Sequence, residues 1–379
     1  MTIYVVVLIT AFLMSFAICP NLSSRRKKIY VIIMFLLIII FSSLRKYTVG
    51  IDLESHYYYS FIKMTEMTLS EAINTIQYDE GYIFFYKIIQ IITDNPQWMI
   101  AIHSIIVFSI IGRFIYKNSE NVLMSTVLII SFNYWFLYMN IMRQALAIVI
   151  ALYAIEIFNS NIKKGVRYFI YITLTIYSLM IHPSAIVAIV YLILKNVQFK
   201  KNTLLLIIVV TLISFGLYSQ IFKMASSFIS SSSVTDYTSR YEDDITGLNV
   251  MSLYRLSIPL ASFVIAYITI IYNKNKNKKS NQLNDKEYLS DDYLIYMVYV
   301  LVLFNILRIK MNIFGRIAEY FAPFSWILLP RAINRIKEKN MRMLLKFLVY
   351  IFLVSTFIWI GNTSAEKLYG TVPYEFFWN

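Results

Sequence analysis

A succession of long apolar runs, each bounded by charged or polar residues, is the feature that most constrains how this chain of 379 residues folds. Apolar residues make up 59% of the sequence and charged residues 15%, whereas about 25% of the residues in soluble globular domains are charged. A helix of about 20 apolar residues crosses the hydrocarbon core of a bilayer. We therefore expect an all-α integral membrane protein, with a single polytopic domain over residues 1–379, and not a water-soluble globule. The runs predict about twelve crossings, near residues 2–19, 29–44, 97–116, 122–139, 143–158, 168–181, 184–194, 203–222, 253–272, 293–307, 314–330 and 347–361.

The run 184–194 is too short to cross a hydrocarbon core of about 30 Å by itself. It directly follows Pro183, whose ring and missing N–H interrupt a helix. We expect this helix either to extend past its apolar part or to be broken at Pro183.

Basic residues concentrate in alternate connections between the runs. When the runs are threaded back and forth across the membrane, these clusters fall on one side, which the positive-inside rule identifies as the cytoplasm. Both termini and the stretch 45–96 then lie on the outer side, so the apolar part 82–93 must follow the interface or re-enter without crossing. The net charge of +14 is mostly a consequence of topology, with anionic lipid headgroups rather than nucleic acid as its partners. The clusters are Arg25 to Lys28, Lys163 to Arg167, Lys195 to Lys201, Lys274 to Lys279 and Arg331 to Lys346.

Two outer segments are long enough to form functional structures: 45–96, with its interfacial helix, and 223–252. The second begins with the serine run 230–233, a composition typical of flexible linkers, and continues with polar and aromatic residues that make it a candidate lid. The Asn- and Lys-rich stretch 273–292 is expected to be a cytoplasmic linker. The candidate substrate-binding residues of the lid are Asp236, Tyr237 and Arg240.

Arg143 opens the helix expected over 143–158, at the outer level of the membrane. Charged side chains near membrane depth are costly, which makes them candidates for function. Ala147, Ala151 and Ala154 continue below it as a small-residue stripe that lets a neighbouring helix pack closely. The alternative interpretation is an arginine at a helix end that snorkels to the interface, although the positive-inside bias disfavours arginine on this side.

Arg45 and His182 end two other runs at the same outer level. Gly50 permits a sharp turn after Arg45, and Asp52 follows where it can pair with Arg45 or Lys46. The alternatives are a structural ion pair and a histidine that is satisfied at a helix end.

Arg308 and Arg316 place further positive charge at the outer level. Arg316 and Glu319 are three residues apart on one helix and can neutralise each other. Alternatively, Arg316 and Tyr320, one turn apart, form a surface for a phosphate and a sugar. Arg255, near the start of the ninth run, has the same two interpretations.

Five arginines therefore mark one outer level from separate places in the chain. If they converge, they form a site for a diphosphate, because each guanidinium donates two parallel charge-assisted hydrogen bonds; otherwise they are five independent snorkelling side chains. Tyrosines and tryptophans near the same level suit a sugar, but they also form the aromatic belt of any membrane protein. The five are Arg45, Arg143, Arg255, Arg308 and Arg316.

An ordered set of short motifs resembles the EpsG-like branch of the Wzy-type polysaccharide polymerases. The resemblance covers nearly the whole chain. It departs from the family pattern at Ile51, where Thr often precedes the Asp, and at Glu80-Gly81, where a Pro commonly intervenes. The motifs are Arg45 with Val49-Gly50-Ile51-Asp52 and Tyr57-Tyr58-Tyr59-Ser60-Phe61, then Glu80-Gly81-Tyr82, Asn140-Ile141-Met142-Arg143-Gln144-Ala145-Leu146-Ala147, His182-Pro183-Ser184-Ala185 and Arg316-Ile317-Ala318-Glu319-Tyr320-Phe321.

The resemblance implies an inverting glycosyltransferase of GT-C-like, all-helical architecture in the cytoplasmic (inner) membrane of a bacterium. Such an enzyme polymerises O-antigen or capsule repeat units carried on undecaprenyl diphosphate, working at the outer face. The growing chain moves from its carrier onto the next lipid-linked repeat. The implied partners are these lipid-linked oligosaccharides and polysaccharides, membrane lipids and a chain-length regulator.

Guanidinium groups in place before the reaction would stabilise a diphosphate leaving group as its charge develops. Arg143 is the first candidate for this role, followed by Arg45 and Arg316, and no metal or other cofactor is expected. A general base for the acceptor hydroxyl must be a carboxylate or a histidine within hydrogen-bond reach. The candidates are Asp52, Glu80, His182 and Asp236.

Two alternative functions share this topology. A flippase for the same lipid-linked oligosaccharide should line a mid-membrane passage with charge, whereas the charges here lie near the outer surface. A ligase would join finished polymer to another acceptor with the same diphosphate chemistry.

Overall fold

The computed structural model describes residues 1–18, 24–195, 197–199, 203–221, 250–272 and 289–379. Within these ranges the regular structure is helical, apart from one isolated antiparallel bridge between Arg45 and Phe376. The all-α prediction is confirmed at this level. The chain forms two compact units, Met1–His182 with Met343–Asn379, and Pro183–Arg342.

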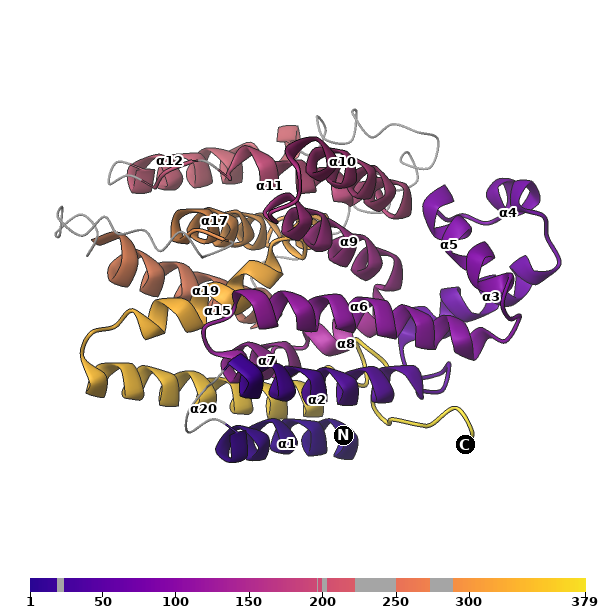
Figure 1. Cartoon of the computed structure of the whole chain (residues 1–379), viewed down its shortest axis with the longest axis horizontal. Helices are drawn as coiled ribbons and strands as arrows, with labels where there is room; N and C mark the ends of the chain where they lie inside the picture. Colours follow the sequence, from indigo (N-terminus) through magenta and orange to yellow (C-terminus); the bar gives the residue numbers. More distant parts are fainter. Residues whose placement is uncertain (19–23, 196, 200–202, 222–249, 273–288) are drawn as a thin grey trace. The chain divides into compact units, whose positions relative to one another are not determined.

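Unit 1, comprising Met1–His182 and Met343–Asn379, contains long helices of 17–25 residues and several shorter ones, arranged as in Figure 1. Its elements are α1 (Thr2–Ile18), α2 (Ser24–Ser43), η1 (Leu53–Tyr57), α3 (Tyr58–Thr65), α4 (Leu69–Thr75), α5 (Glu80–Gln90), α6 (Pro96–Asn118), α7 (Val122–Ser131), α8 (Tyr134–Asn140), α9 (Met142–Phe158), α10 (Lys164–Ile181) and most of α20 (Lys339–Thr363).

Helices α2 and α6 lie side by side and antiparallel, as Figure 1 shows. At one end, the Gln97 side-chain amide donates to the carbonyls of Ser43, at 2.6 Å, and Arg45, at 3.1 Å. At the other end, the Lys27 ammonium donates to the Ser119 carbonyl. The segment 45–96 therefore begins and ends at the same end of unit 1. The alternation of basic clusters in the sequence predicts the same arrangement. This end is named the Arg45 end, and the opposite one the Lys27 end.

Basic residues gather at the Lys27 end. The Glu156 carboxylate accepts a hydrogen bond from Arg113 at 2.8 Å and another from Lys117. The Arg167 guanidinium lies 5.7 Å from the ring centre of Phe158, at the junction of α9 and α10. Positive charge therefore concentrates at the Lys27 end of unit 1.

Three described helices are long and apolar enough to cross a membrane: Pro96–Asn118, Val250–Ile271 and Lys339–Thr363. The pair α7 and α8 meets the same criterion as one span bent by 56°. The remaining runs form shorter helices or helices with charged ends. For example, α9 has 17 residues, which span about 26 Å at about 1.5 Å per residue.

The helix is interrupted at Pro183, which confirms one of the two outcomes expected for the run 184–194. Helix α10 ends at Ile181, and His182 has extended backbone angles, the conformation favoured before a proline. The chain continues as a 3₁₀ helix, η2 (Pro183–Ala188), and then as α11 (Ile189–Ile193).

Unit 2, comprising Pro183–Arg342, has α19 at its centre. Almost every residue of α19 is buried, and it packs against α15 and α17. The buried Arg331 at its end donates to the Leu289 carbonyl at 2.8 Å and to Asp291 at 3.1 Å. The elements after α11 are α12 (Thr203–Gly216), α15 (Val250–Ala266), η3 (Tyr267–Tyr272), α17 (Asp291–Leu307), α18 (Ile313–Ala318) and α19 (Ala322–Asn334).

Candidate active site

Arg143, the second residue of α9, forms an ion pair with Asp79 at the Arg45 end of unit 1. Its NH1 lies 3.0 Å from Asp79 Oδ2, and the two side chains are 15% and 24% exposed. Asp79 is the N-cap residue of α5, yet its carboxylate makes no cap hydrogen bond to that helix. The side chain that would ordinarily satisfy the first N–H groups of a helix is thus turned to the arginine instead.

Tyrosine rings surround this ion pair. The Arg143 guanidinium carbon lies 4.7 Å from the ring centre of Tyr78, close enough for a cation–π contact. The ring of Tyr78 contacts those of Tyr57 and Tyr82, with centroids 5.9 and 5.7 Å apart. The Tyr82 hydroxyl donates to that of Tyr86 at 3.0 Å. The pair therefore lies in a setting poor in water, where charge interactions are stronger than in bulk solvent.

Burial changes the proton affinities of these groups. It raises the pKa of Tyr78 to about 12 and that of Tyr57 above its usual value, so both phenols stay protonated at neutral pH. Burial also raises the pKa of the Asp79 carboxyl, although the nearby Arg143 charge opposes that rise. Asp79 is therefore a stronger base than a solvated aspartate.

Asp52 belongs to the same cluster. Its negative charge acts on the hydroxyls of both Tyr57 and Tyr78, the two tyrosines that also respond to the Arg143 charge. The carboxylates of Asp52 and Asp79 and the guanidinium of Arg143 thus belong to one cluster at this end of unit 1.

Glu80, the base candidate in the Glu80-Gly81-Tyr82 motif, is exposed at the start of α5. The carboxylate facing Arg143 is that of Asp79, which the sequence analysis missed. Its position directly before the first helical residue was a usable signal, because aspartate is favoured at an N-cap.

Gly81 holds α5 directly against α10. A Cβ built on Gly81 would lie 2.6 Å from the Met180 carbonyl carbon and 2.8 Å from its oxygen, so only glycine fits at this approach. His182 is the C-cap residue of α10 and is buried, and its backbone N–H donates to the Ser178 carbonyl at 3.0 Å.

Arg45 is completely buried, at 0% exposure, and directs its guanidinium at backbone. Its NH2 donates to the Met139 carbonyl at 2.9 Å. Neither cation expected to pair with Asp52 does so. Arg45 donates to backbone, and Lys46 pairs with Glu375, in the C-terminal segment, at 3.0 Å.

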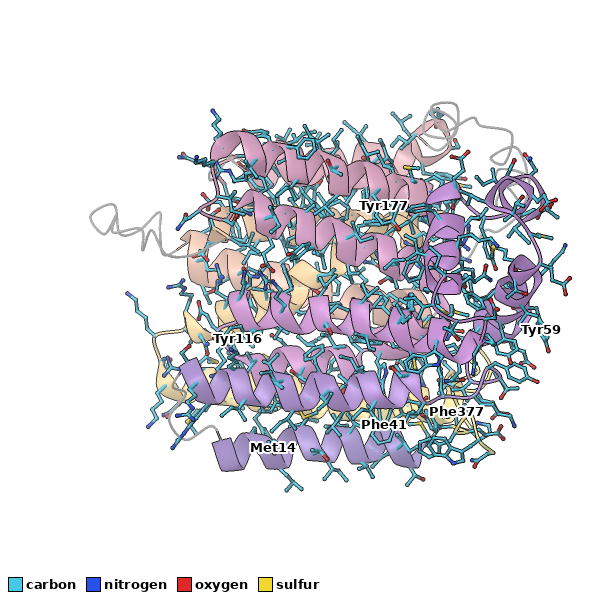
Figure 2. All side chains as sticks on the ribbon, turned by 45° about the vertical axis from the view of Figure 1, so that its right-hand side comes forward. Met14, Phe41, Tyr59, Tyr116, Tyr177 and Phe377 are labelled. Carbon is cyan, nitrogen blue, oxygen red and sulfur yellow. The ribbon has the colours of Figure 1, made fainter. Side chains whose placement is uncertain are left out.

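Aromatic side chains also lie at the surface of the Arg45 end. Tyr47 and Tyr58 are stacked with ring centres 4.4 Å apart, and Tyr59 beside them is 55% exposed. In the C-terminal segment, Phe376 and Trp378 are stacked at 4.5 Å. Figure 2 labels Tyr59 and Phe377 at this end, away from Tyr116 at the Lys27 end.

Unit 2 contains a second charged cluster, at the end of α17 and in α18. Glu319 pairs with Arg255 on α15, at 3.7 Å, and not with Arg316 as one interpretation of the sequence expected. Arg308 also acts on the Glu319 charge, and its guanidinium packs so closely on Gly315 that a Cβ there would lie 2.8 Å from Arg308 Nε.

Tyr320 is also in unit 2 and is fully buried. Its hydroxyl accepts a hydrogen bond from Ser184 at 3.2 Å, and its carbonyl accepts one from Tyr191 at 2.5 Å. Asp236, Tyr237 and Arg240 lie outside the described residues. In the part of the chain that the structure describes, no group of three His, Cys, Asp or Glu side chains is placed to hold a metal ion.

A comparison with models of protein families matches the EpsG family over residues 28–376. The chain belongs to the EpsG family. No curated protein and no solved structure matches it. The family match extends from α2 to the C-terminal segment, so it includes Arg143, Asp79, Asp52 and the unit 2 cluster. Family membership and the apolar helices make this EpsG-family chain a membrane protein with a polysaccharide-polymerase type of function, glycosyltransferase-like in its general chemistry.

Proposed function

We propose that this EpsG-family protein polymerises oligosaccharide repeat units carried on undecaprenyl diphosphate at the outer face of a bacterial cytoplasmic membrane. The observation that carries the proposal is the ion pair of Arg143 with Asp79, set among tyrosines at the end of unit 1 opposite Arg113 and Lys117. A cation and a base side by side are what the transfer of a glycosyl group from a diphosphate needs.

In the proposed reaction, a hydroxyl of the acceptor repeat attacks the anomeric carbon of the donor chain. The bond from that carbon to the diphosphate oxygen breaks, and undecaprenyl diphosphate leaves with the bonding electron pair. The hydroxyl proton passes to a carboxylate, and the configuration at the anomeric carbon inverts. Arg143 stabilises the negative charge that develops on the leaving diphosphate.

Asp79 is the proposed general base, with Asp52 as the second carboxylate of the cluster. A diphosphate that binds Arg143 competes with Asp79 for the guanidinium and thereby frees the carboxylate to accept a proton. The raised pKa of Asp79 suits this role, because a base works best when its pKa lies near the working pH. Donor binding thus prepares the base for the acceptor.

Within unit 2, Arg255 and Arg308 both act on Glu319, and Arg316 lies on the neighbouring α18, so we propose that this cluster binds a phosphate group. We further propose that the chain completes about twelve crossings in a GT-C-like arrangement, several of them by short or bent helices. The exposed Tyr59, beside the partly buried Tyr47 and Tyr58, offers a flat face for a sugar ring of the repeat.

The test supplies the purified protein, in lipid nanodiscs, with an authentic undecaprenyl-diphosphate-linked repeat. Wild type should produce a ladder of longer lipid-linked products. Arg143→Ala and Asp79→Asn should leave the repeat unextended, while Glu80→Gln, which changes the adjacent exposed carboxylate, should retain the ladder. The proposal fails if the wild-type protein makes no ladder, or if Arg143→Ala makes chains of wild-type length.

The same preparation separates the alternatives. Movement of a fluorescent lipid-linked repeat across vesicle membranes without extension would support a flippase. Transfer of preformed polymer to a second acceptor, with no extension of single repeats, would support a ligase.

A further inference from the structure

The junction between α8 and α9 interrupts helical hydrogen bonding just before Arg143. Helix α8 ends at Asn140, Ile141 has non-helical backbone angles (φ −74°, ψ 53°), and α9 begins at Met142. Carbonyl groups at such an interruption lose their helical partners and need other donors, which in a buried place must come from the protein.

Two cationic or polar side chains from elsewhere in unit 1 supply donors at this junction. Arg45, which follows α2, donates to the Met139 carbonyl at 2.9 Å. His103 of α6 contacts the Met142 carbonyl through Nε2 at 2.9 Å, so this nitrogen carries the proton. Both side chains are almost fully buried, at 0% and 1% exposure. The junction is therefore fixed from two sides.

Asn140 connects the junction to two further segments. Its Oδ1 accepts a hydrogen bond from the backbone N–H of Asp52 at 3.3 Å. Its Nδ2 donates to the carbonyl of Tyr369, in the C-terminal segment, at 2.9 Å. Asn140 thus contacts the backbone of one cluster carboxylate and lies less than one helical turn before the cluster arginine, Arg143.

Residues 369–377, named the C-terminal tail, are held against the chain that follows α2. The backbone N–H groups of Gly50 and Ile51 donate to the carbonyls of Gly370, at 2.9 Å, and Tyr369, at 3.2 Å. Farther along, Lys46 N–H donates to Glu375 at 2.9 Å and Phe377 N–H donates to Leu44 at 3.0 Å. These bonds bring the tail to the α8–α9 junction. Gly50 has a φ of +126°, which side chains other than glycine rarely adopt, and a Cβ there would touch Asn140 Oδ1.

We propose that Asn140, held by the C-terminal tail, is a positioning residue that sets the distance between the Arg143 guanidinium and the Asp52 carboxylate. It touches no substrate and acts through the two residues it places. This inference rests on the proposed function, because it assigns Asn140 to the same reaction. Arg45 shares the positioning role, in place of the diphosphate contact expected from the sequence.

The test measures kcat and KM for extension of the lipid-linked repeat, per folded molecule, with the folded fraction followed by tryptophan fluorescence. Asn140→Asp keeps the side-chain shape but sets a carboxylate oxygen against the Tyr369 carbonyl. A misplacement of about 1 Å lowers a rate about 100-fold, so kcat should fall by about that factor while KM changes little. Glu375→Gln is the control, since it removes the Lys46 ion pair in the tail without touching the junction, and it should keep kcat.

A second variant guards against failure of Asn140→Asp to fold. Gly370→Ala acts where the tail meets the segment before Asp52, because an added Cβ would lie 2.8 Å from the Ile51 side chain, and it should lower kcat about 10-fold through the displaced tail. The positioning role is overturned if wild type extends the repeat while both variants keep wild-type kcat per folded molecule. A wild-type protein that extends nothing overturns the proposed function and this inference together.

Discussion

Substitution of Gly81 by alanine is expected to push α5 away from α10 and to disturb the Arg143–Asp79 pair. The added Cβ would lie 2.6, 2.7 and 2.8 Å from three atoms of Met180, two of which belong to the backbone. Backbone atoms cannot rotate out of the way as the end of a flexible side chain can. The helices must therefore separate until the contact reaches about 3.4 Å, a shift of about 0.8 Å.

The energetic cost follows from two opposing effects. Overpacking of this kind costs about 1–3 kcal/mol, and the rigid partner at Gly81 favours the upper part of that range. Alanine gains up to about 1 kcal/mol over glycine in a helix. The expected net destabilisation is about 1–2 kcal/mol, which lowers the melting temperature by a few degrees in a chain of this size. Because Asp79 lies two residues away, catalysis should fall more steeply, about 10- to 100-fold.

Gly165→Ala is the matched control, because Gly165 lies at the start of α10 and a Cβ there meets nothing within 4 Å. Melting temperature and rate of extension are measured for both variants in the same nanodiscs. Gly165→Ala should keep the rate and keep or slightly raise the melting temperature. If Gly81→Ala behaves in the same way, α5 does not contact α10 directly at Gly81. That result would also refute a role of this contact in positioning Asp79 beside Arg143.

Three further outcomes are expected. A double-mutant cycle of Asp79→Asn with Arg143→Met should give a favourable coupling of about 1–2 kcal/mol, less than the 3–5 typical of a fully buried pair because both partners keep some exposure; additive effects would contradict it. Because burial raises the pKa of Asp79 in the folded state, the folded protein binds more protons than the unfolded one between the two pKa values, so stability should decrease as pH rises through that interval; a melting-temperature profile of Asp79→Asn should lack this decrease. In unit 2, Arg255→Met should lower stability by about 3 kcal/mol, because it leaves a buried carboxylate without its ion pair. The double variant Arg255→Met with Glu319→Gln should lose less. Equal losses of the two variants, measured by urea or thermal unfolding, would argue against the pair.

Several features of the fold could be predicted from local patterns alone. Apolar runs with charged boundaries identified the helices, since burial in a membrane requires long stretches of apolar residues regardless of distant partners. The proline after His182 identified the break that the structure contains, because its effect on the helix acts on the immediately preceding residues. The alternation of basic clusters required the segment 45–96 to return to its starting side, and the Gln97 contacts agree with this.

The partners of the charged residues could not be predicted in this way. The sequence singled out Arg143 but not its partner Asp79, because the direction of a side chain at a helix start depends on the helix it meets. Likewise Arg45 looked like a ligand for phosphate, and burial at the α8–α9 junction makes it a donor to backbone.

The sequence by itself thus determined the helical class, the order of the motifs and the arginine at the start of α9. Hydrophobic periodicity and helix boundaries are local, so they can be read over a few turns. Only the tertiary structure decided that Asn140 meets Tyr369 and that Lys46 pairs with Glu375, hydrogen bonds between residues 229 and 329 positions apart. Such contacts leave no periodic trace in the sequence, because they depend on how whole helices pack before the two side chains come within reach.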